Sequence, residues 1–520
     1  MILMLFGIAI VVGFYYYCVK PLSYWKEKGV LQTEPMWFFG DSWRSFDKQR
    51  VINFLEYLYH GPGDGRYVGH YNFTYPVLNI KDPELLKRVF VKDFDHFVDH
   101  YVFQATDSDP LWSNILITLK GSKWREMRSI LSPCFTSSKM RAMSPLMTGC
   151  AERFTNYFLN LNEEVVSVEV KEAFTRYATD VIGSTAFGVE VDSLKQPENT
   201  FYVMGKRATT FDFWKMVRFF ISVLAPKLNA LLGLMIMDKE TLDFFVDLVD
   251  QTIKTREEKG IIRPDMIHLL MEARKGRLKN EESRENDSSD RIVSDIALKN
   301  ITNIDIAAQA MIFFLGGFET SSNLMSFMAY ELAANKYVQD RLRKEIQDTL
   351  DECNGQLTHE ALLKMKYMDM VVSETLRKWP SNLVIDRECT KPYTLEPVQS
   401  REKPIHLEKG SYVSAMVYCI HRDPKYFPNP DIFDPERFSS ENIDKIQPYT
   451  YLPFGVGPRS CIGSRFALLE TKALFFYLLM SFEIVRTEKS CKSVQLERKG
   501  ISYMIKGGNW LGLRALKRGV

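Results

Sequence analysis

The chain has 520 residues, of which 46% are hydrophobic, and its formal net charge at pH 7 is +2. The apolar content is sufficient for a large core, and the nearly balanced charge gives no reason to expect a nucleic-acid partner. Eight cysteines are scattered along the chain without a Cys-x-x-Cys pair. Their spacing excludes a small disulfide framework and favours a reducing, cytosol-facing body.

The N-terminal segment predicts a membrane anchor. Residues 1–19 carry no charge, and a helix of this length spans about 28 Å, close to the hydrocarbon thickness of a bilayer. Lys20, Lys26 and Lys28 follow the apolar run, and the positive-inside tendency places them in the cytosol. A cleaved signal peptide is the alternative, but it would need a basic start and a small-residue cleavage site. We therefore expect an uncleaved anchor at residues 1–19 and a connector at residues 20–41.

Local patterns predict the first elements of the body. The β-branched and aromatic residues of 66–80, bounded by Gly and Pro, predict two strands joined by a turn. A helix is expected to begin in residues 84–91, and helical periodicity dominates from about residue 121 to residue 354. Residues 271–300 are polar and charged, so we expect an exposed loop between two helical blocks.

A second long apolar stretch covers residues 211–237. It is interrupted by four charged residues and a proline, which argues against a second transmembrane span: Asp212, Lys215, Arg218, Pro226 and Lys227. One interpretation is a helix hairpin in the core. The other is an apolar loop that dips into the membrane beside a substrate entrance.

Residues 301–333 predict one long helix with two adjacent glycines, Gly316 and Gly317, in its middle. Each glycine costs about 1 kcal/mol relative to alanine in a helix interior, and the missing side chains would leave room for a planar cofactor and a small ligand. Glu319 and Thr320 follow directly, and an acid behind a hydroxyl can relay protons. The alternative is a weakened helix whose threonine hydroxyl bonds back to a carbonyl.

A further helix is predicted at residues 367–379, where Glu374 and Arg377 lie three positions apart on one face. Such a pair is common and is usually a solvated surface pair. From spacing alone, this pair indicates no chemistry.

The most informative segment is the glycine-rich loop of residues 453–465, which carries Cys461 just before a helical run. Free N–H groups and the macrodipole at a helix N-terminus lower a thiol pKa, so we expect Cys461 to be held as a thiolate. Gly455, Gly457 and Gly463 allow the backbone to bend and to approach a large flat partner. A thiolate without a second ligand nearby suits one axial bond to a haem iron. A buried structural cysteine in a turn is the alternative.

The pattern Phe454-x-x-Gly457-x-Arg459-x-Cys461-x-Gly463 resembles the haem-binding signature of the cytochrome P-450 superfamily. Gly317-x-Glu319-Thr320 resembles its oxygen-activation motif, and Glu374-x-x-Arg377 resembles its Glu-x-x-Arg motif. The resemblance covers about residues 30 to 510. Residues 20–26, 93–97 and 131–140 resemble the insect microsomal branch, which is related to drug-metabolising members.

The resemblance implies a mainly helical fold with a smaller β-rich part, here a catalytic domain over residues 42–520 with an N-terminal transmembrane helix. It implies a haem b cofactor and a single-pass protein of the endoplasmic reticulum, with its catalytic body on the cytosolic side. The expected reaction is monooxygenation of lipophilic molecules, xenobiotics such as plant toxins or insecticides, with O₂. Electrons would come from an NADPH-dependent reductase, with cytochrome b5 as a further partner.

The resemblance also assigns site residues. Cys461 is expected to ligate the iron, and Thr320 and Glu319 are expected to guide protons. Residues expected to contact the haem or its propionates are Phe454, Arg459, Trp124, Arg128 and Arg387. Arg437 is expected to join Glu374 and Arg377 in a buried cluster that fixes the cysteine loop. The chain departs from many relatives at His100, where they carry an arginine.

Substrate identity does not follow from the sequence. Expected pocket residues are lipophilic and partly aromatic: Phe103, Leu116, Phe213, Phe313, Leu383 and Val384. Metabolism of endogenous hormones, lipids or pheromones is the alternative role. A haem-thiolate isomerase or dehydratase and a non-catalytic haem sensor are further alternatives, and the Glu319–Thr320 pair argues against the first. Cations that could face a reductase are Lys120, Lys123, Arg125 and Lys139.

Overall fold

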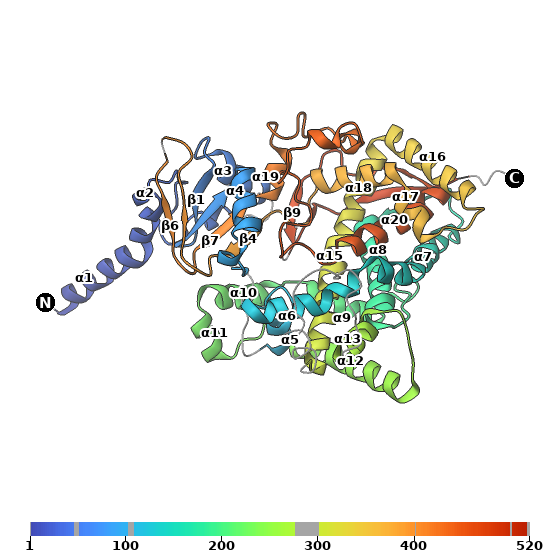
Figure 1. Cartoon of the computed structure of the whole chain (residues 1–520), viewed down its shortest axis with the longest axis horizontal. Coiled ribbons are helices and arrows are strands. Elements are labelled where there is room, and N and C mark those ends of the chain that lie inside the picture. The colour runs from blue at the N-terminus through green and yellow to red at the C-terminus, as the bar shows by residue number, and fades with distance from the viewer. Residues whose placement is uncertain are drawn as a thin grey trace.

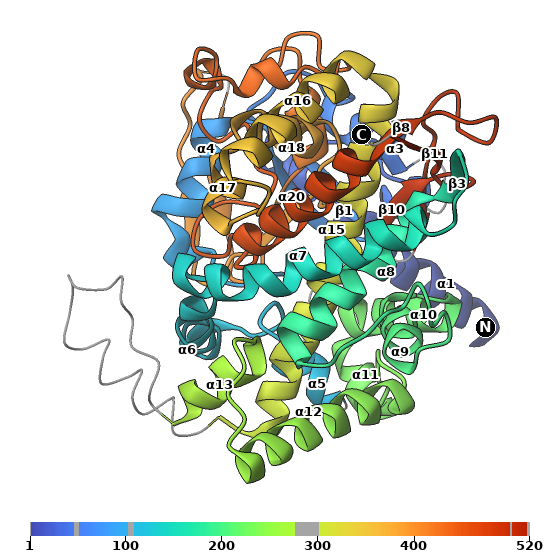
Figure 2. The ribbon, with the colours of Figure 1, turned by 90° about the vertical axis from the view of Figure 1, so that its right-hand side faces the viewer.

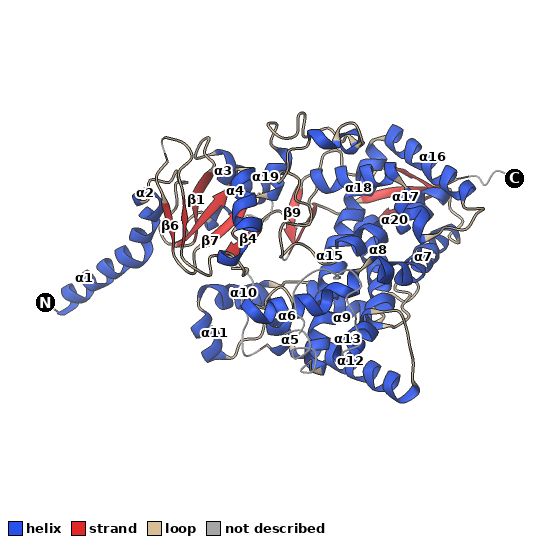
Figure 3. Cartoon of the chain, in the orientation of Figure 1, coloured by secondary structure: helices blue, strands red, loops and turns tan. Residues whose placement is uncertain are grey.

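Helices make up most of the chain, and the strands form small sheets (Figure 3). The computed structural model describes residues 2–45, 51–101, 109–275, 301–400, 402–499 and 502–516. The α-helices are α1 (Ile2–Phe14), α2 (Tyr24–Glu27), α3 (Val51–His60), α4 (Pro83–Lys87), α5 (Pro110–Asn114), α6 (Gly121–Leu131), α7 (Ser137–Leu159), α8 (Val170–Ile182), α9 (Thr200–Thr209), α10 (Phe213–Leu224), α11 (Pro226–Leu232), α12 (Lys239–Lys259), α13 (Met266–Arg274), α15 (Asn303–Ala334), α16 (Lys336–Glu352), α17 (His359–Lys364), α18 (Lys366–Lys378), α19 (Val417–Arg422) and α20 (Ser464–Ser481).

The strands are β1 (Tyr67–Asn72), β2 (Tyr75–Ile80), β3 (Val165–Glu169), β4 (Ile385–Glu388), β5 (Tyr393–Leu395), β6 (Ile405–Leu407), β7 (Tyr412–Ala415), β8 (Phe482–Val485), β9 (Leu496–Lys499), β10 (Ser502–Ile505) and β11 (Trp510–Ala515). The largest sheet has the order β1-β2-β7-β4. Its β1–β2 hairpin is antiparallel, with Tyr67 opposite Ile80, as predicted for residues 66–80. The prediction of a mainly helical fold with a smaller β-rich part is confirmed.

The N-terminal helix projects away from the body (Figure 1). α1 continues through a π-helical turn (Tyr15–Val19) and a 3-10 turn (Lys20–Ser23) into α2. No residue of α1 is buried. Among the residues that the structure describes, Ile2–Glu27 is the one helix long and apolar enough to cross a membrane. From residue 2 to residue 19, the predicted anchor lies within this helix.

The long helix α15 passes through the middle of the helical body, with α8 beside it (Figure 2). It begins at a capping box, in which Thr302 and Asp305 bond to each other's backbone. The helix also packs against α5, α12, α9, α18 and α20. Because helices surround it, most of its residues are buried, and polar side chains on it must find partners inside the protein.

Two regional predictions need adjustment. The helical region of residues 121–354 is interrupted by β3, which pairs with the distant strand β11. The expected loop of residues 271–300 starts later, because α13 extends to Arg274, and residues 276–300 lie outside the described residues. The apolar stretch of residues 211–237 forms two short helices, α10 and α11, and no second membrane span was found in the described parts of the chain.

Candidate active site

Segments far apart in the sequence line one cavity of about 1050 Å³. The cavity lies among α15, α6, β4 and the loop that precedes α20. Cys461 contributes to its lining from the loop, and Gly316, Glu319 and Thr320 contribute from α15. The residues expected to contact a haem, including Phe454, also line it. The structure thus brings together the two motifs that the sequence placed more than a hundred residues apart.

The loop that carries Cys461 is held by its own backbone. The Cys461 N–H donates to the carbonyl of Phe454 at 2.8 Å, and the Ser460 N–H donates to that of Gly457 at 2.9 Å. Gly457 has a φ of +75°, and a Cβ there would lie 2.0 Å from the carbonyl oxygen of Phe90. Only glycine fits both constraints, which explains why the motif needs glycine at this position.

Opposing effects act on the protonation of Cys461. Burial raises the pKa of the Cys461 thiol, while the Gly463 N–H and the Arg128 guanidinium act in the opposite direction. The Cys461 side chain is exposed toward the cavity, so this balance describes the protein groups alone, and the thiolate stays a prediction. A coordinated metal ion deprotonates a thiol outright, so this position suits a thiolate when a metal ion is bound.

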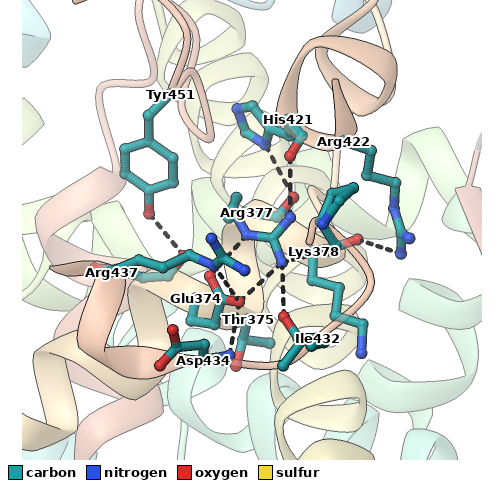
Figure 4. A network of polar contacts seen from close by, with 12 residues as sticks. Glu374, Thr375, Arg377, Lys378, His421, Arg422, Ile432, Asp434, Arg437 and Tyr451 are labelled. Atoms are coloured by element: carbon teal, nitrogen blue, oxygen red, sulfur yellow. Dashed lines mark hydrogen bonds and ion pairs between the residues drawn. The ribbon is translucent and has the colours of Figure 1, made fainter. Parts of the chain in front are cut away.

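A buried ionic cluster stands behind the loop (Figure 4). Glu374 and Arg377 are both fully buried, and their side chains make two hydrogen bonds of 2.7 and 2.8 Å. Arg437 adds its Nε at 3.5 Å from Glu374, and the Asp434 N–H donates to the same carboxylate at 2.9 Å. The interpretation as a solvated surface pair is wrong, and the predicted cluster of three is confirmed.

The two glycines of α15 have different surroundings. A Cβ on Gly316 would meet no heavy atom within 4 Å, whereas one on Gly317 would lie 2.8 Å from Ile182 on α8. Gly316 therefore leaves open space beside the helix, as predicted for a planar group. Gly317 instead permits the close packing of α15 on α8.

The hydroxyl of Thr320 donates to the carbonyl of Gly316, one turn earlier in α15. This is the backbone-bonded arrangement that the sequence left open as an alternative to a proton relay. Thr320 nevertheless lines the cavity, so both descriptions apply to one side chain. The hydroxyl is held in place at the cavity wall, where its lone pairs can accept a hydrogen bond from a ligand.

Sequence reasoning missed the partner of Glu319. Lys171, on α8, places its Nζ 3.4 Å from Glu319 Oε1 and donates to Ser322 Oγ at 2.5 Å. Burial lowers the pKa of Lys171, and the Glu319 carboxylate opposes this. The sequence gives one indication of this partner: Lys171 stands among the mostly apolar residues that α8 buries.

Arg459 and Trp124 form one unit at the cavity wall. The guanidinium lies over the indole ring at 4.0 Å and donates to the carbonyls of Val98 at 2.9 Å and Leu119 at 2.7 Å. It also lies 3.3 Å from the carboxylate of Asp99. Most N–H donors of Arg459 therefore hold the cysteine loop against the segment of residues 98–119.

Other cations line the cavity with capacity for an anionic group. Burial lowers the pKa of Arg387 to about 10, and its buried Nε has no hydrogen-bond partner among the described residues. Arg128, on α6, lines the same cavity. His100 places Nδ1 2.9 Å from Asp386, which orients the ring. A buried, unsatisfied guanidinium N–H requires an acceptor, and a carboxylate matches its geometry.

These residues fit a haem group. A single thiol faces the cavity from the cysteine loop, open space lies beside Gly316, and arginines with a buried orphan donor suit propionates. Haem-thiolate ligation needs one protein sulfur and no second protein ligand. The fit therefore rests on the chemistry of the donor set.

The predicted pocket residues are mostly placed as expected. Leu116, Phe313, Leu383 and Val384 line the cavity, and Phe103 lies outside the described residues. Phe213 was predicted wrongly, because it begins α10 with its side chain in solvent, at 72% exposure. Aromatic residues on or beside α10 take its place in the lining: Phe211, Phe219 and Phe220.

Two cations of the predicted reductase-facing group already have acidic partners. Lys120 pairs with Glu388 at 2.6 Å, and Arg125 pairs with Asp95 at 2.5 Å. Their charges are partly neutralised, so this surface is less basic than the sequence indicated.

The comparisons with known proteins agree with this site. A family model described as Cytochrome P450 matches residues 32–511. The chain is 44% identical over 483 residues to cytochrome P450 9e2 of Blattella germanica, with 89% of each chain covered. It is 40% identical over 520 residues to probable cytochrome P450 9f2 of Drosophila melanogaster, with 98% of each chain covered. The chain belongs to the cytochrome P450 family.

The predicted membership and the predicted extent of the resemblance are therefore confirmed. Another similar relative is cytochrome P450 6k1 of Blattella germanica, 37% identical over 495 residues, which covers 95% of this chain and 92% of the relative. As a member of the family, this cytochrome P450 is a monooxygenase, an oxidoreductase that uses thiolate-ligated haem.

Proposed function

We propose that this cytochrome P450 oxidises lipophilic xenobiotics, such as plant toxins or insecticides, with electrons from an NADPH-dependent reductase. The observation that carries the proposal is that Cys461 and the Glu319–Thr320 pair line one cavity with aromatic and aliphatic walls. Charged residues also line this cavity, but its aromatic and aliphatic walls suit a lipophilic guest. Metabolism of an endogenous hormone, lipid or pheromone would use the same machinery and is the alternative.

The proposed division of the chain is an anchor at residues 1–19, a connector at residues 20–41 and a catalytic domain at residues 42–520. The exposed apolar helix at the N-terminus supports the first part. The family match begins at residue 32, which supports a boundary near the connector. We assign the protein to the endoplasmic reticulum membrane, as a single-pass protein with its body in the cytosol, because the lysines follow the apolar run.

Each site residue has a proposed role. Cys461 would be the iron ligand, with Phe454 beside it, and Arg128, Arg387, Arg459 and Trp124 would hold the propionates. When bound, the haem supplies the redox chemistry that activates dioxygen for insertion of one oxygen atom. The apolar walls would exclude water.

The residues of α15 would handle protons at the cavity wall. The Thr320 hydroxyl would pass its proton toward a ligand by turning its O–H away from the Gly316 carbonyl. Glu319, held by Lys171, would resupply the proton from the direction of α8. The acid–alcohol pair would have no such use in a haem-thiolate isomerase or in a carrier.

Reconstitution tests the proposed function. The full chain would be placed in phospholipid vesicles with an NADPH-dependent reductase and supplied with a panel of lipophilic toxins, insecticides, steroids and fatty acids. We expect oxygen-18 from labelled dioxygen in the products of xenobiotics, with a requirement for NADPH and reductase. Turnover of steroids or fatty acids alone would support the endogenous role. Product without electrons would show an isomerase, and no turnover would favour a carrier. Addition of cytochrome b5 would test that partner.

The membrane assignment has a separate test. Protease treatment of intact microsomes is expected to degrade the body and to leave a fragment of the anchor. Protection of the whole body inside the vesicles would contradict the proposed topology.

A further inference from the structure

His421 connects the buried ionic cluster to the cysteine loop. It lies near the end of α19 and is fully buried, with 0% of its surface exposed. Its ring stacks on Tyr451 with 5.5 Å between centroids and 27° between planes. Figure 4 shows the ring beside Arg377, at the top of the cluster. A buried imidazole in such a place must satisfy both ring nitrogens.

The contacts of the ring define its tautomer. The Leu452 N–H donates to Nε2 at 2.7 Å, so Nε2 is an acceptor. Nδ1 lies 3.1 Å from the carbonyl of Arg377, so Nδ1 must carry the proton and donate it. Arg377 Nη1 donates in return to the His421 carbonyl at 3.0 Å. Burial lowers the pKa of His421 to about 3, so the ring stays neutral.

The hydrogen bonds continue from Leu452 toward the cysteine. The Leu452 carbonyl accepts from the Gly455 N–H at 3.1 Å, and the Phe454 carbonyl accepts from the Cys461 N–H at 2.8 Å. A short series of backbone contacts thus leads from the imidazole to the backbone of Cys461. One further contact holds the same segment, because the Tyr451 hydroxyl donates to the Ser373 carbonyl at 3.0 Å.

We propose that His421 is a positioning residue for the thiolate: the Nδ1–H tautomer leaves Nε2 as an acceptor, and Nε2 fixes the start of the cysteine loop through the Leu452 N–H. The inference rests on the proposed role of Cys461 as iron ligand. If His421 only filled space, the shape of its ring would matter, but the hydrogen bonds of its two nitrogens would not. The experiment therefore has to remove one nitrogen function at a time.

Two substitutions separate the functions. In His421→Gln the side-chain amide can reach the position of Nε2 and accept from Leu452, whereas in His421→Asn it reaches only the position of Nδ1 and can bond Arg377. The matched control is His70→Asn. His70 is also a buried histidine, at 5% exposure, and burial lowers its pKa to about 3 as well. It lies on β1, and it does not line the cavity.

Two readouts are compared in folded protein: amide hydrogen exchange at Leu452 and Cys461, and the rate at which the thiolate-type band of the reduced carbonyl form is lost on warming. For His421→Asn we expect both to increase roughly tenfold, the effect of one lost buried hydrogen bond. His421→Gln should stay close to the wild type, and His70→Asn should change neither. Equal behaviour of the Asn and Gln variants, or an effect of the control as large as that of His421→Asn, would overturn the proposal.

The tautomer of His421 can also be measured in the wild-type protein, so this test does not require that a variant folds. With histidine labelled in its ring nitrogens, the carbonyl-bound ferrous protein should show one histidine as a neutral Nδ1–H tautomer from pH 5.5 to 8. The assignment is made by its absence in His421→Gln, and an Nε2–H tautomer would contradict the proposal. If instead Cys461 is not the ligand, the exchange and tautomer results still stand, whereas the band of the carbonyl form would not respond.

Discussion

The ammonium group of Lys171 on α8 lies 3.4 Å from the Oε1 of Glu319 on α15. The same ammonium contacts Ser322 Oγ and the Glu319 backbone carbonyl, so its three donors meet three acceptors. Lysine is seldom buried without such partners. The carboxylate beside Thr320 is thus held in position by a neighbouring helix.

Replacement of Lys171 by Met should impair the coupling of electron use to product. Without the cation, Glu319 loses its partner, and we expect about tenfold less product per NADPH and more peroxide. Lys171→Arg should restore much of the loss, and Lys195→Met, which removes a lysine exposed at 64%, should have no effect. The ratio of peroxide to product measures the change. A fully coupled Lys171→Met enzyme would show that the ion pair has no part in proton transfer.

Removal of the Thr320 hydroxyl should affect chemistry more than folding. Among the described residues, the Thr320 hydroxyl bonds only within its own helix, so Thr320→Ala should keep its haem content and its substrate-induced spectral shift. Loss of one proton donor is worth roughly 10²–10⁴ in rate. Product formation should fall while peroxide rises, and Thr320→Ser should retain activity. Unchanged product per NADPH in Thr320→Ala would remove this residue from the mechanism.

The buried cluster should be costly to break. Glu374→Gln leaves the guanidinium of Arg377 buried beside a neutral amide, and removal of one partner of a buried pair costs about 3–5 kcal/mol. Urea unfolding of the haem-loaded protein should show this loss. As a control, Asp340→Asn disrupts an ion pair on the surface, in which the Asp340 side chain is 46% exposed and that of Lys336 is 69% exposed. This substitution should change the free energy of unfolding by less than about 1 kcal/mol. Equal effects of the two substitutions would refute the assigned role of the cluster.

Stability should fall as the pH rises, in part because of Glu470. Burial raises the pKa of this fully buried acid to about 8 from its ordinary 4.5. The folded state therefore holds a proton that the unfolded chain has released, and the contribution of this group to stability is lost between about pH 4.5 and 8. Asp180, with its pKa raised to about 7, acts in the same direction.

The substitution Glu470→Gln should remove this part of the pH dependence. Relative to the wild type, the variant should become more stable with rising pH, by a few kcal/mol at pH 8.5 compared with pH 5. Urea midpoints at three pH values measure the difference, and Glu441→Gln, at an exposed position, serves as the control. Parallel pH profiles of the wild type and Glu470→Gln would show that the buried acid does not titrate in this range.

Much of the fold follows from local pattern. The hairpin of β1 and β2 has β-branched and aromatic residues bounded by Gly and Pro, and α15 has long apolar periodicity, so short windows of sequence suffice for both. The cysteine loop is also local, because its glycines, Arg459 and Cys461 lie within a few residues of one another.

Relationships across long sequence separations do not follow from such windows. Lys171 and Glu319 are 148 residues apart, and nothing near either residue indicates the other. The outward direction of Phe213 depends on how α10 sits on the body, which its own composition does not determine.

The central claim is that Cys461 is the thiolate ligand of the haem. The most direct test is the spectrum of the reduced carbonyl form of Cys461→Ser, compared with that of Cys134→Ser, which alters a fully buried cysteine that does not line the cavity. We predict that the red-shifted Soret band typical of thiolate ligation is absent in Cys461→Ser and present in the control. Survival of that band in folded Cys461→Ser protein would contradict the account.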